Sequence, residues 1–259
     1  MPPSHADLAL RLRTAYSTGA VPPLRDGLAP TDADGAYTIQ NLNTRFWQQQ
    51  GRRIAGRKIG LTARAVQAQL GVNQPDFGVL FADTEIPNGG TLHAHRVLQP
   101  KAEAEVALII GQDINKPDAT EADILHACAY ATAALEIVDS RIQDWKITFA
   151  DTVADNGSSA CYVLGTTRAP LPGLDLYTCG MVMTVNGEIA SLGTGAACLG
   201  HPLRAAAWLV RTLAPLGEGL RAGDIVLTGA LGPMVTITPG DKIHTEIAGL
   251  GTASFEFCA

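Results

Sequence analysis

The sequence has few of the features that mark secreted, membrane or nucleotide-binding proteins. Its five cysteines are odd in number and widely spaced, and no two form a C-x-x-C pair, which argues against a disulfide framework and a zinc site. We therefore expect reduced thiols. The longest weakly polar run, 126–138, is too short to span a bilayer and contains His126 and Glu136. The N-terminus lacks an apolar segment and contains Asp7, so we expect no targeting signal and a cytoplasmic protein.

The charge distribution argues against nucleic-acid binding. The net charge is −6, and the 19 lysine and arginine residues are scattered along the chain. The glycine-rich run 193–200 lacks the spacing of a phosphate-binding loop, so we expect no nucleotide. With 259 residues, of which 46% are hydrophobic, the chain is long enough for one catalytic domain over 1–259, with 1–55 a helical N-terminal extension packed on it.

Two glutamates begin an otherwise apolar strand in the stretch 99–110, QPKAEAEVALII. Side chains alternate along a strand, so Glu103 and Glu105 point to the same face. Two buried like charges this close need a shared proton or a cation between them, and carboxylates favour Mg²⁺, Mn²⁺ or Ca²⁺. The alternative is a solvated strand edge carrying two glutamates.

Three further residues stand out because their surroundings are unusual for their charge. Glu136 lies in the apolar strand LEIVD and is the natural third ligand for Glu103 and Glu105, because a lone buried glutamate needs a partner. Lys58 has apolar and glycine neighbours, which fits a surface charge or an active-site group with a lowered pKa. Asp76 directly follows a proline, and an aspartate in this position is common in ordinary turns.

The residue pattern predicts a mixed α+β protein that is rich in strands. Helices are expected at 6–16, 37–50, 64–70, 121–134 and 201–216. For the second helix, Asp34 or Thr38 is the expected cap and Ile39, Leu42 and Phe46 the buried stripe. The segment 151–159, DTVADNGSS, is predicted to be a functional loop, with an ordinary turn as the alternative. A hairpin at 181–189 and short strands after 223 predict a β-rich roll or barrel.

Seven segments, in order along nearly the whole chain, resemble the 2-keto-4-pentenoate hydratases of the fumarylacetoacetate hydrolase superfamily. They are KIGLT from Lys58, QPDFGVLFAD from Gln74, LQPKAEAEVAL from Leu98, ALEIVDSRIQDWKI from Ala134, DTVADNGSS from Asp151, CLGHPL from Cys198 and LRAGDIVLTGALGPMV from Leu220.

The resemblance implies a fold, a metal and an assembly. The fold is a mixed β-sandwich roll, and Glu103, Glu105 and Glu136 hold Mg²⁺ or Mn²⁺, with no organic cofactor. The assembly is a homo-oligomer, either a pentamer or a decamer that is built from two pentamers. A neighbouring enzyme of the same pathway is a possible partner.

The implied reaction is the addition of water to 2-hydroxypenta-2,4-dienoate, which gives 4-hydroxy-2-oxopentanoate in the meta-cleavage catabolism of aromatic compounds. Lys58 and Asp76 then face the substrate and handle protons or water. Ser158 and the backbone of Thr228 and Gly229 help to hold the substrate carboxylate.

Three alternative functions remain open from the sequence. A vinylogous 2-oxo acid decarboxylase acting on 4-oxalocrotonate shares the metal ligands, but PDFGVL and DWKI look more like the hydratases. A C–C hydrolase of the same superfamily needs a His-Glu pair near the N-terminal side, and no such motif is evident. A non-catalytic partner subunit of a decarboxylase would not need Lys58, Asp76 and all three glutamates.

Overall fold

Two β-sheets form the body of the molecule in the computed structural model, which describes residues 1–259. The larger, eight-stranded sheet contains, in order, β2 (Asp76–Phe81), β1 (Ile54–Gly60), β10 (Ile225–Ala230), β5 (Pro100–Ile110), β6 (Cys128–Asp139), β7 (Ser159–Leu164) and β3 (Glu85–Ile86), with β11 (Val235–Thr236) beside β5. The five-stranded sheet contains β4 (Gly90–His93), β13 (Gly251–Cys258), β12 (Lys242–Ile247), β8 (Gly180–Val185) and β9 (Glu188–Thr194). The expected β-rich α+β class is confirmed.

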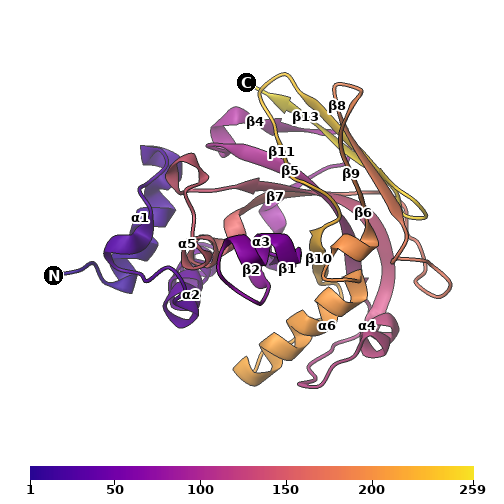
Figure 1. Ribbon diagram of the computed structural model, residues 1–259, viewed down its shortest axis with the longest axis horizontal. Helices are drawn as coiled ribbons and strands as arrows, with labels where there is room; N and C mark the ends of the chain where they lie inside the picture. Colours follow the sequence, from indigo (N-terminus) through magenta and orange to yellow (C-terminus); the bar gives the residue numbers. More distant parts are fainter.

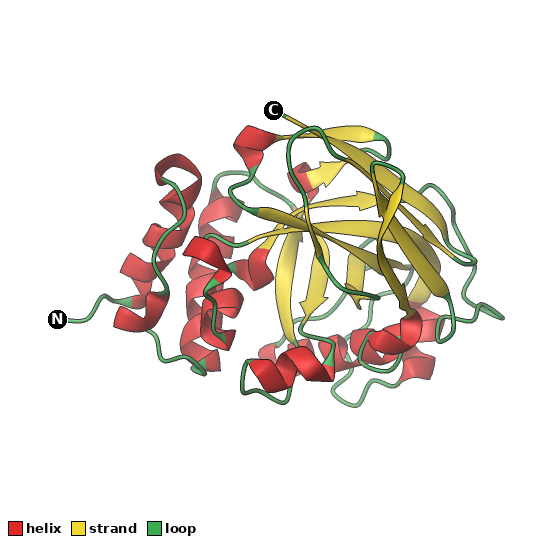
Figure 2. Ribbon diagram, turned by 45° about the horizontal axis from the view of Figure 1, so that its top comes forward, coloured by secondary structure: helices red, strands yellow, loops and turns green.

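The helices gather in two places around the strands (Figures 1 and 2). They are α1 (His5–Thr18), α2 (Ala33–Gln49), α3 (Arg64–Gln69), α4 (Glu121–Ala127), α5 (Phe149–Ala154) and α6 (Pro202–Leu213). Helices α1, α2 and α5 pack together at one end of the strands, and α4 packs against α6. No helix has the length and apolarity needed to cross a bilayer.

The alternation along β5 separates the hydrophobic core from the polar site. Ala102, Ala104 and Val106 point into the main core, which includes Ile243 and Phe255 of the smaller sheet. Burying one such aliphatic side chain contributes about 1.5–3 kcal/mol. The opposite face of β5 therefore carries the two glutamates, as the strand period predicts.

A second apolar cluster joins the N-terminal helices to α5. Leu8 and Leu12 of α1, Ile39 of α2 and Phe149 and Val153 of α5 are buried together. Helix α5 is followed by a 3-10 turn at Asn156–Ser158 that leads into β7. This cluster therefore fixes the position of the turn.

The second helix differs from its prediction at its start and on one face. Helix α2 begins at Ala33, and Asp32 is its cap because its carboxylate accepts a hydrogen bond of 2.9 Å from the Gly35 amide. The expected caps, Asp34 and Thr38, both lie inside the helix. Of the predicted stripe, Ile39 is buried, whereas Leu42 is exposed, so that portion of the prediction was wrong.

Two other expectations were wrong about secondary structure. The predicted helix 121–134 ends at Ala127, and the alanine-rich residues after it belong to β6, which pairs with both β5 and β7. Continuous pairing with β5 from Cys128 onward outweighs the helix propensity of alanine, and β7 pairs with β6 from Ala134 onward. The predicted loop 151–159 is largely helical, because Thr148 and Asp151 form a capping box that starts α5.

The hairpin, the last long helix and the thiols agree with expectation. Asn186 and Gly187 both adopt positive φ angles between β8 and β9, as a two-residue hairpin turn requires. Helix α6 begins after His201, whose Nδ1 accepts a hydrogen bond from the Leu203 amide, and it passes into a 3-10 turn at Ala214–Leu216. All five cysteines are free.

Candidate active site

Three glutamates converge on the face of the larger sheet that points away from the main core. Glu103 of β5 lies directly opposite Glu136 of β6 in the strand register, and Glu105 lies two residues further along β5. One carboxylate oxygen of each residue lies within 4.8 Å of the others. Glu105 and Glu136 are fully buried, and Glu103 is partly exposed. The cluster is therefore not a solvated strand edge.

Three buried carboxylate oxygens of this cluster accept no hydrogen bond. They are Oε1 of Glu105 and both carboxylate oxygens of Glu136. Burial raises the pKa of Glu103 to about 7 against the opposing effect of Lys58, and it also raises the pKa values of Glu105 and Glu136. Orphaned buried carboxylates are costly unless a cation joins them. The donor set thus fits a hard divalent cation.

Lys58 reaches the same cluster from β1. Its side chain is almost fully buried, and its Nζ lies 3.4 Å from Oε2 of Glu136 and donates a hydrogen bond of 3.0 Å to the Gly157 carbonyl. Burial alone lowers the pKa of Lys58, but the carboxylates of Glu136 and Asp76 outweigh it and raise the pKa above its ordinary value. The surface position is therefore wrong: Lys58 is buried beside the glutamates, and their charges shift its pKa upward and not downward.

Asp76 begins β2 opposite Gly60 of β1. It is 1% exposed, and its Oδ1 has no hydrogen-bond partner. Burial raises its pKa, while the charge of Lys58 opposes this shift. The residue is therefore not a solvated turn aspartate, and it shares a buried site with Lys58.

The remaining expected site residues have donors that the protein already uses. The Thr228 hydroxyl donates to the Val106 carbonyl over 3.0 Å, and the Gly229 amide donates to Oε2 of Glu105 over 2.7 Å. The Ser158 hydroxyl lies 3.3 Å from the hydroxyl of Thr152. In this arrangement the Gly229 amide binds a glutamate of the cluster, and the contact of Ser158, Thr228 and Gly229 with a substrate carboxylate stays a prediction.

Comparisons with known proteins identify the family of this chain. The family model of the fumarylacetoacetate (FAA) hydrolase C-terminal region matches residues 52–257. The chain belongs to the fumarylacetoacetate hydrolase family. It is 53% identical to 2-keto-4-pentenoate hydratase 1 of Dechloromonas aromatica (strain RCB), over 96% of this chain and 95% of that protein. It is 50% identical to the 2-keto-4-pentenoate hydratase of Burkholderia vietnamiensis (strain G4 / LMG 22486), over 98% of this chain and 97% of that protein.

A solved structure of the same family also matches over nearly the whole chain. The 4-oxalocrotonate decarboxylase from Pseudomonas putida G7, complexed with magnesium and adipate, superposes with a TM-score of 0.92 at 34% identity. The match covers 98% of this chain and 97% of that one. The resemblance of the sequence to the hydratases and the fold that it implied are confirmed.

The sequence did not identify the residues that position the turn before β7. The Asn156 amide group bridges to the edge strand β2, accepting from the Val79 amide over 2.7 Å and donating to the Val79 carbonyl over 2.9 Å. The buried Arg141 pairs with Asp155 and donates to the Ser159 carbonyl. The one signal in the sequence for this contact was Arg141, a single arginine that closely follows the apolar strand ending at Asp139.

Gly60 provides a test of the contact between β1 and Asp76. A Cβ atom at Gly60 would lie 2.1 Å from Oδ1 of Asp76 and 3.2 Å from Nζ of Lys58. We expect Gly60→Ala to displace the Asp76 carboxylate and to lower kcat by about tenfold or more, because misplacing a catalytic group by about 1 Å can cost about 10²-fold. Steady-state kinetics beside a melting curve measure this. An unchanged kcat would contradict the placement of Asp76.

Proposed function

We propose that the protein is a hydro-lyase that adds water to 2-hydroxypenta-2,4-dienoate to give 4-hydroxy-2-oxopentanoate in the catabolism of aromatic compounds. One observation carries this proposal: Glu103, Glu105 and Glu136 converge beside Lys58 in a chain about half identical to 2-keto-4-pentenoate hydratases. The three glutamates alone would not separate the hydratases from other metal-dependent members of the family.

The three glutamates would hold one divalent cation, which we propose to be Mg²⁺ or Mn²⁺ in the cell. The Pseudomonas putida decarboxylase was solved in one complex with magnesium and in another with calcium, which supports a divalent ion for this site. When bound, such an ion supplies Lewis-acid polarisation to the carboxylate and 2-oxygen of a 2-hydroxydienoate. The unpartnered oxygens of Glu105 and Glu136 are the ligands that it would satisfy.

Lys58 and Asp76 would act on the substrate itself. An ammonium has three N–H donors, and the bond from Lys58 to the Gly157 carbonyl leaves two to orient an anionic substrate. Asp76, with a raised pKa and an unpartnered Oδ1, is suited to hold a water molecule or to move a proton. We assign Ser158 to the substrate carboxylate, and Thr228 and Gly229 to the support of that end of the site.

The reaction then needs an isomerisation and one addition of water. In the first step the 2-hydroxyl loses its proton and C5 gains one, which gives the 2-oxo-3-enoate. In the second step water loses a proton as its oxygen adds to C4, and a proton is added to C3 to complete the product. Each proton enters at a carbon atom near a buried acid or base, so water must reach the site in a controlled position. The buried positions of Lys58 and Asp76 meet this requirement.

A 4-oxalocrotonate decarboxylase is the second candidate function, because the structure from Pseudomonas putida G7 is so similar. The purified protein with Mg²⁺ should be incubated separately with 2-hydroxypenta-2,4-dienoate and with 4-oxalocrotonate. We expect loss of the dienol absorbance with the first compound and no release of CO₂ from the second. Release of CO₂ without hydration would identify a decarboxylase, and inactivity on both would favour a partner subunit or a C–C hydrolase.

The remaining proposals concern assembly and location. We propose a cytoplasmic homo-oligomer, a decamer or a pentamer, built from one catalytic domain over 1–259 that includes the helical N-terminal extension, residues 1–55. A neighbouring enzyme of the pathway is a candidate partner. Sedimentation of the purified protein would measure the number of subunits, and a monomer would contradict this proposal.

A further inference from the structure

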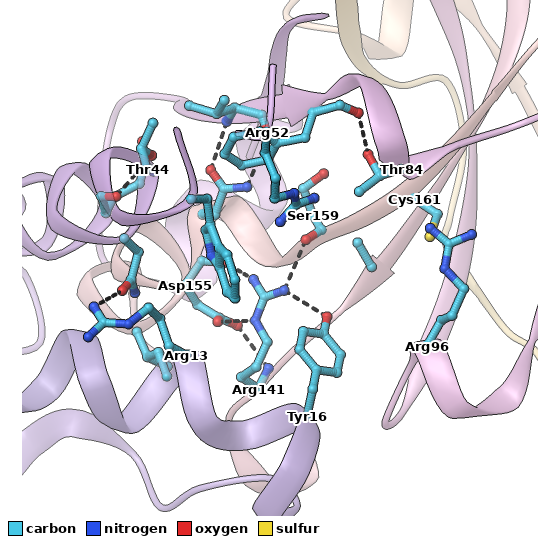
Figure 3. Close-up of a pocket in the computed structure, with 18 of the residues that line it drawn as sticks. Arg13, Tyr16, Thr44, Arg52, Thr84, Arg96, Arg141, Asp155, Ser159 and Cys161 are labelled. Carbon is cyan, nitrogen blue, oxygen red and sulfur yellow. Dashed lines mark hydrogen bonds and ion pairs between the residues drawn. The ribbon is translucent and has the colours of Figure 1, made fainter. Parts of the chain in front are cut away.

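A second cavity lies apart from the glutamate site. It has a volume of about 310 Å³ and lies where α1 and α2 meet strands β2 and β7 (Figure 3). None of the three glutamates lines it, and neither Lys58 nor Asp76 does. The proposed hydration reaction therefore leaves this cavity without a role.

The wall of this cavity is rich in positive charge. Arg13, Arg52, Arg96 and Arg141 line it, which is four of the 19 lysine and arginine residues in a chain of net charge −6. The single acidic residue in the wall, Asp155, is paired with Arg141. Figure 3 shows Arg141 in the centre of the wall, between Asp155, Tyr16 and Ser159. Arg13 and Arg96 form no ion pair, and Arg52 pairs with Asp83 outside the wall, so the cavity keeps an excess of positive charge.

Arg52 is held in place with donors to spare. Its Nε donates to the carboxylate of Asp83, at 3.0 and 2.8 Å from the two oxygens, and Asp83 lies outside the cavity wall. Its guanidinium carbon lies 5.3 Å from the ring centroid of Trp47 and 4.2 Å from that of Phe81. Neither of its terminal nitrogens, Nη1 and Nη2, makes a hydrogen bond within the protein. A fixed guanidinium with free terminal N–H groups is suited to bind a carboxylate.

The apolar residues of the cavity wall indicate what kind of ligand would fit beside the arginines. Trp47, Phe81, Val79 and Leu12 give the cavity flat and apolar surfaces next to the arginines. A compact ligand with one anionic end and an unsaturated ring would use both features, and a volume of about 300 Å³ is at the lower end of small-molecule sites. We propose that this cavity binds an aromatic carboxylate, with its carboxylate at Arg52 and its ring against the apolar wall.

The test uses 4-fluorobenzoate as the probe and follows its fluorine resonance during titration with the whole protein. Metal is removed with EDTA so that the glutamate site does not bind the probe through a cation. We expect Arg52→Gln to weaken binding by about tenfold or more, since a hydrogen bond to a charged group contributes about 1.5–3 kcal/mol. Arg96 also contacts Asp83, donating to its carbonyl over 3.3 Å, so Arg96 lies near Arg52 and Arg96→Gln should weaken binding as well. Arg45→Gln is the matched control, because Arg45 lies on the neighbouring helix α2 and outside the cavity wall.

Two reference compounds test the two halves of the proposal. The proposal predicts weak or absent binding of 4-fluorobenzyl alcohol, which lacks the charge, and little displacement of the probe by inorganic phosphate, which lacks the ring. Equal binding of the alcohol, full displacement by phosphate at an equal concentration, or unchanged binding in both folded variants would each overturn it. Melting curves establish whether each variant is folded. If Arg52→Gln does not fold, the result for Arg96→Gln decides the test.

Discussion

Replacing Lys58 by methionine is expected to lower kcat for 2-hydroxypenta-2,4-dienoate by about 10²–10⁴-fold, the range typical of a general acid–base group. Methionine keeps an apolar stem of similar length but removes the ammonium that lies 3.4 Å from Glu136 and donates to Gly157. Methionine fills the space of the lysine stem, but removal of one partner of a buried ion pair typically costs about 3–5 kcal/mol, so we expect a folded variant with a lower melting temperature. Steady-state kinetics measure the effect.

Two controls separate this role from a general effect of losing a lysine. Lys146→Met removes an ammonium whose side chain is 68% exposed, and it should leave kcat and KM unchanged. If Lys58 serves mainly to bind the substrate carboxylate, the Lys58→Met change should raise KM with less effect on kcat. Wild-type values for both constants would remove Lys58 from the active site and leave Asp76 to carry the proton chemistry.

The sequence predicted the charged portion of this site because its pattern is local. Two glutamates at alternate positions of one strand must face the same side, and Glu136 in an apolar strand must find a partner. Lys58 and Asp76 were ambiguous, since surface lysines and turn aspartates are common. The structure places both in the site through the pairing of β1 with β2, which is a contact between segments that local sequence does not specify.

The features that could not be predicted depend on long-range packing. Residues 128–134 have the composition of a helix, yet they form a strand because β5 pairs with β6 along this whole stretch, and β7 joins from Ala134 onward. The function of Asn156 depends on the edge of β2, which lies 77 residues away in the sequence. Neither relation leaves a periodic signal in the sequence, so a single sequence without the fold cannot show it.

Metal affinity should depend on pH in a definite direction. Burial raises the pKa of Glu103 to about 7, and binding of a cation requires the carboxylates in their ionised form. Protons therefore compete with the metal, and we expect Mg²⁺ to bind more weakly at about pH 6 than at about pH 8. Calorimetry at the two values should also show release of protons to the buffer. Equal affinity at both values would mean that the Glu103 carboxyl is already ionised at about pH 6, and would contradict the raised pKa of this residue.

Activity is expected to disappear with EDTA and to return with Mg²⁺ or Mn²⁺, and Glu105→Gln should prevent that return at ordinary metal concentrations. Glutamine keeps the shape and an oxygen for the Gly229 amide, but it removes the negative charge. Loss of an outer-shell partner of a metal ligand costs about 10–100-fold in affinity, so loss of a charged ligand should cost at least as much. Metal titrations followed by activity and by melting temperature measure this.

The matched control for this change is Glu188→Gln, which removes a glutamate from an exposed position at the start of β9. It should bind Mg²⁺ as the unaltered protein does. In Glu105→Gln the melting temperature without metal should not fall, because the change removes one of three mutually repelling carboxylates from a buried cluster. The stabilisation by Mg²⁺ should shrink instead. Full activity of the metal-free Glu105→Gln protein would rule out the three glutamates as the metal site.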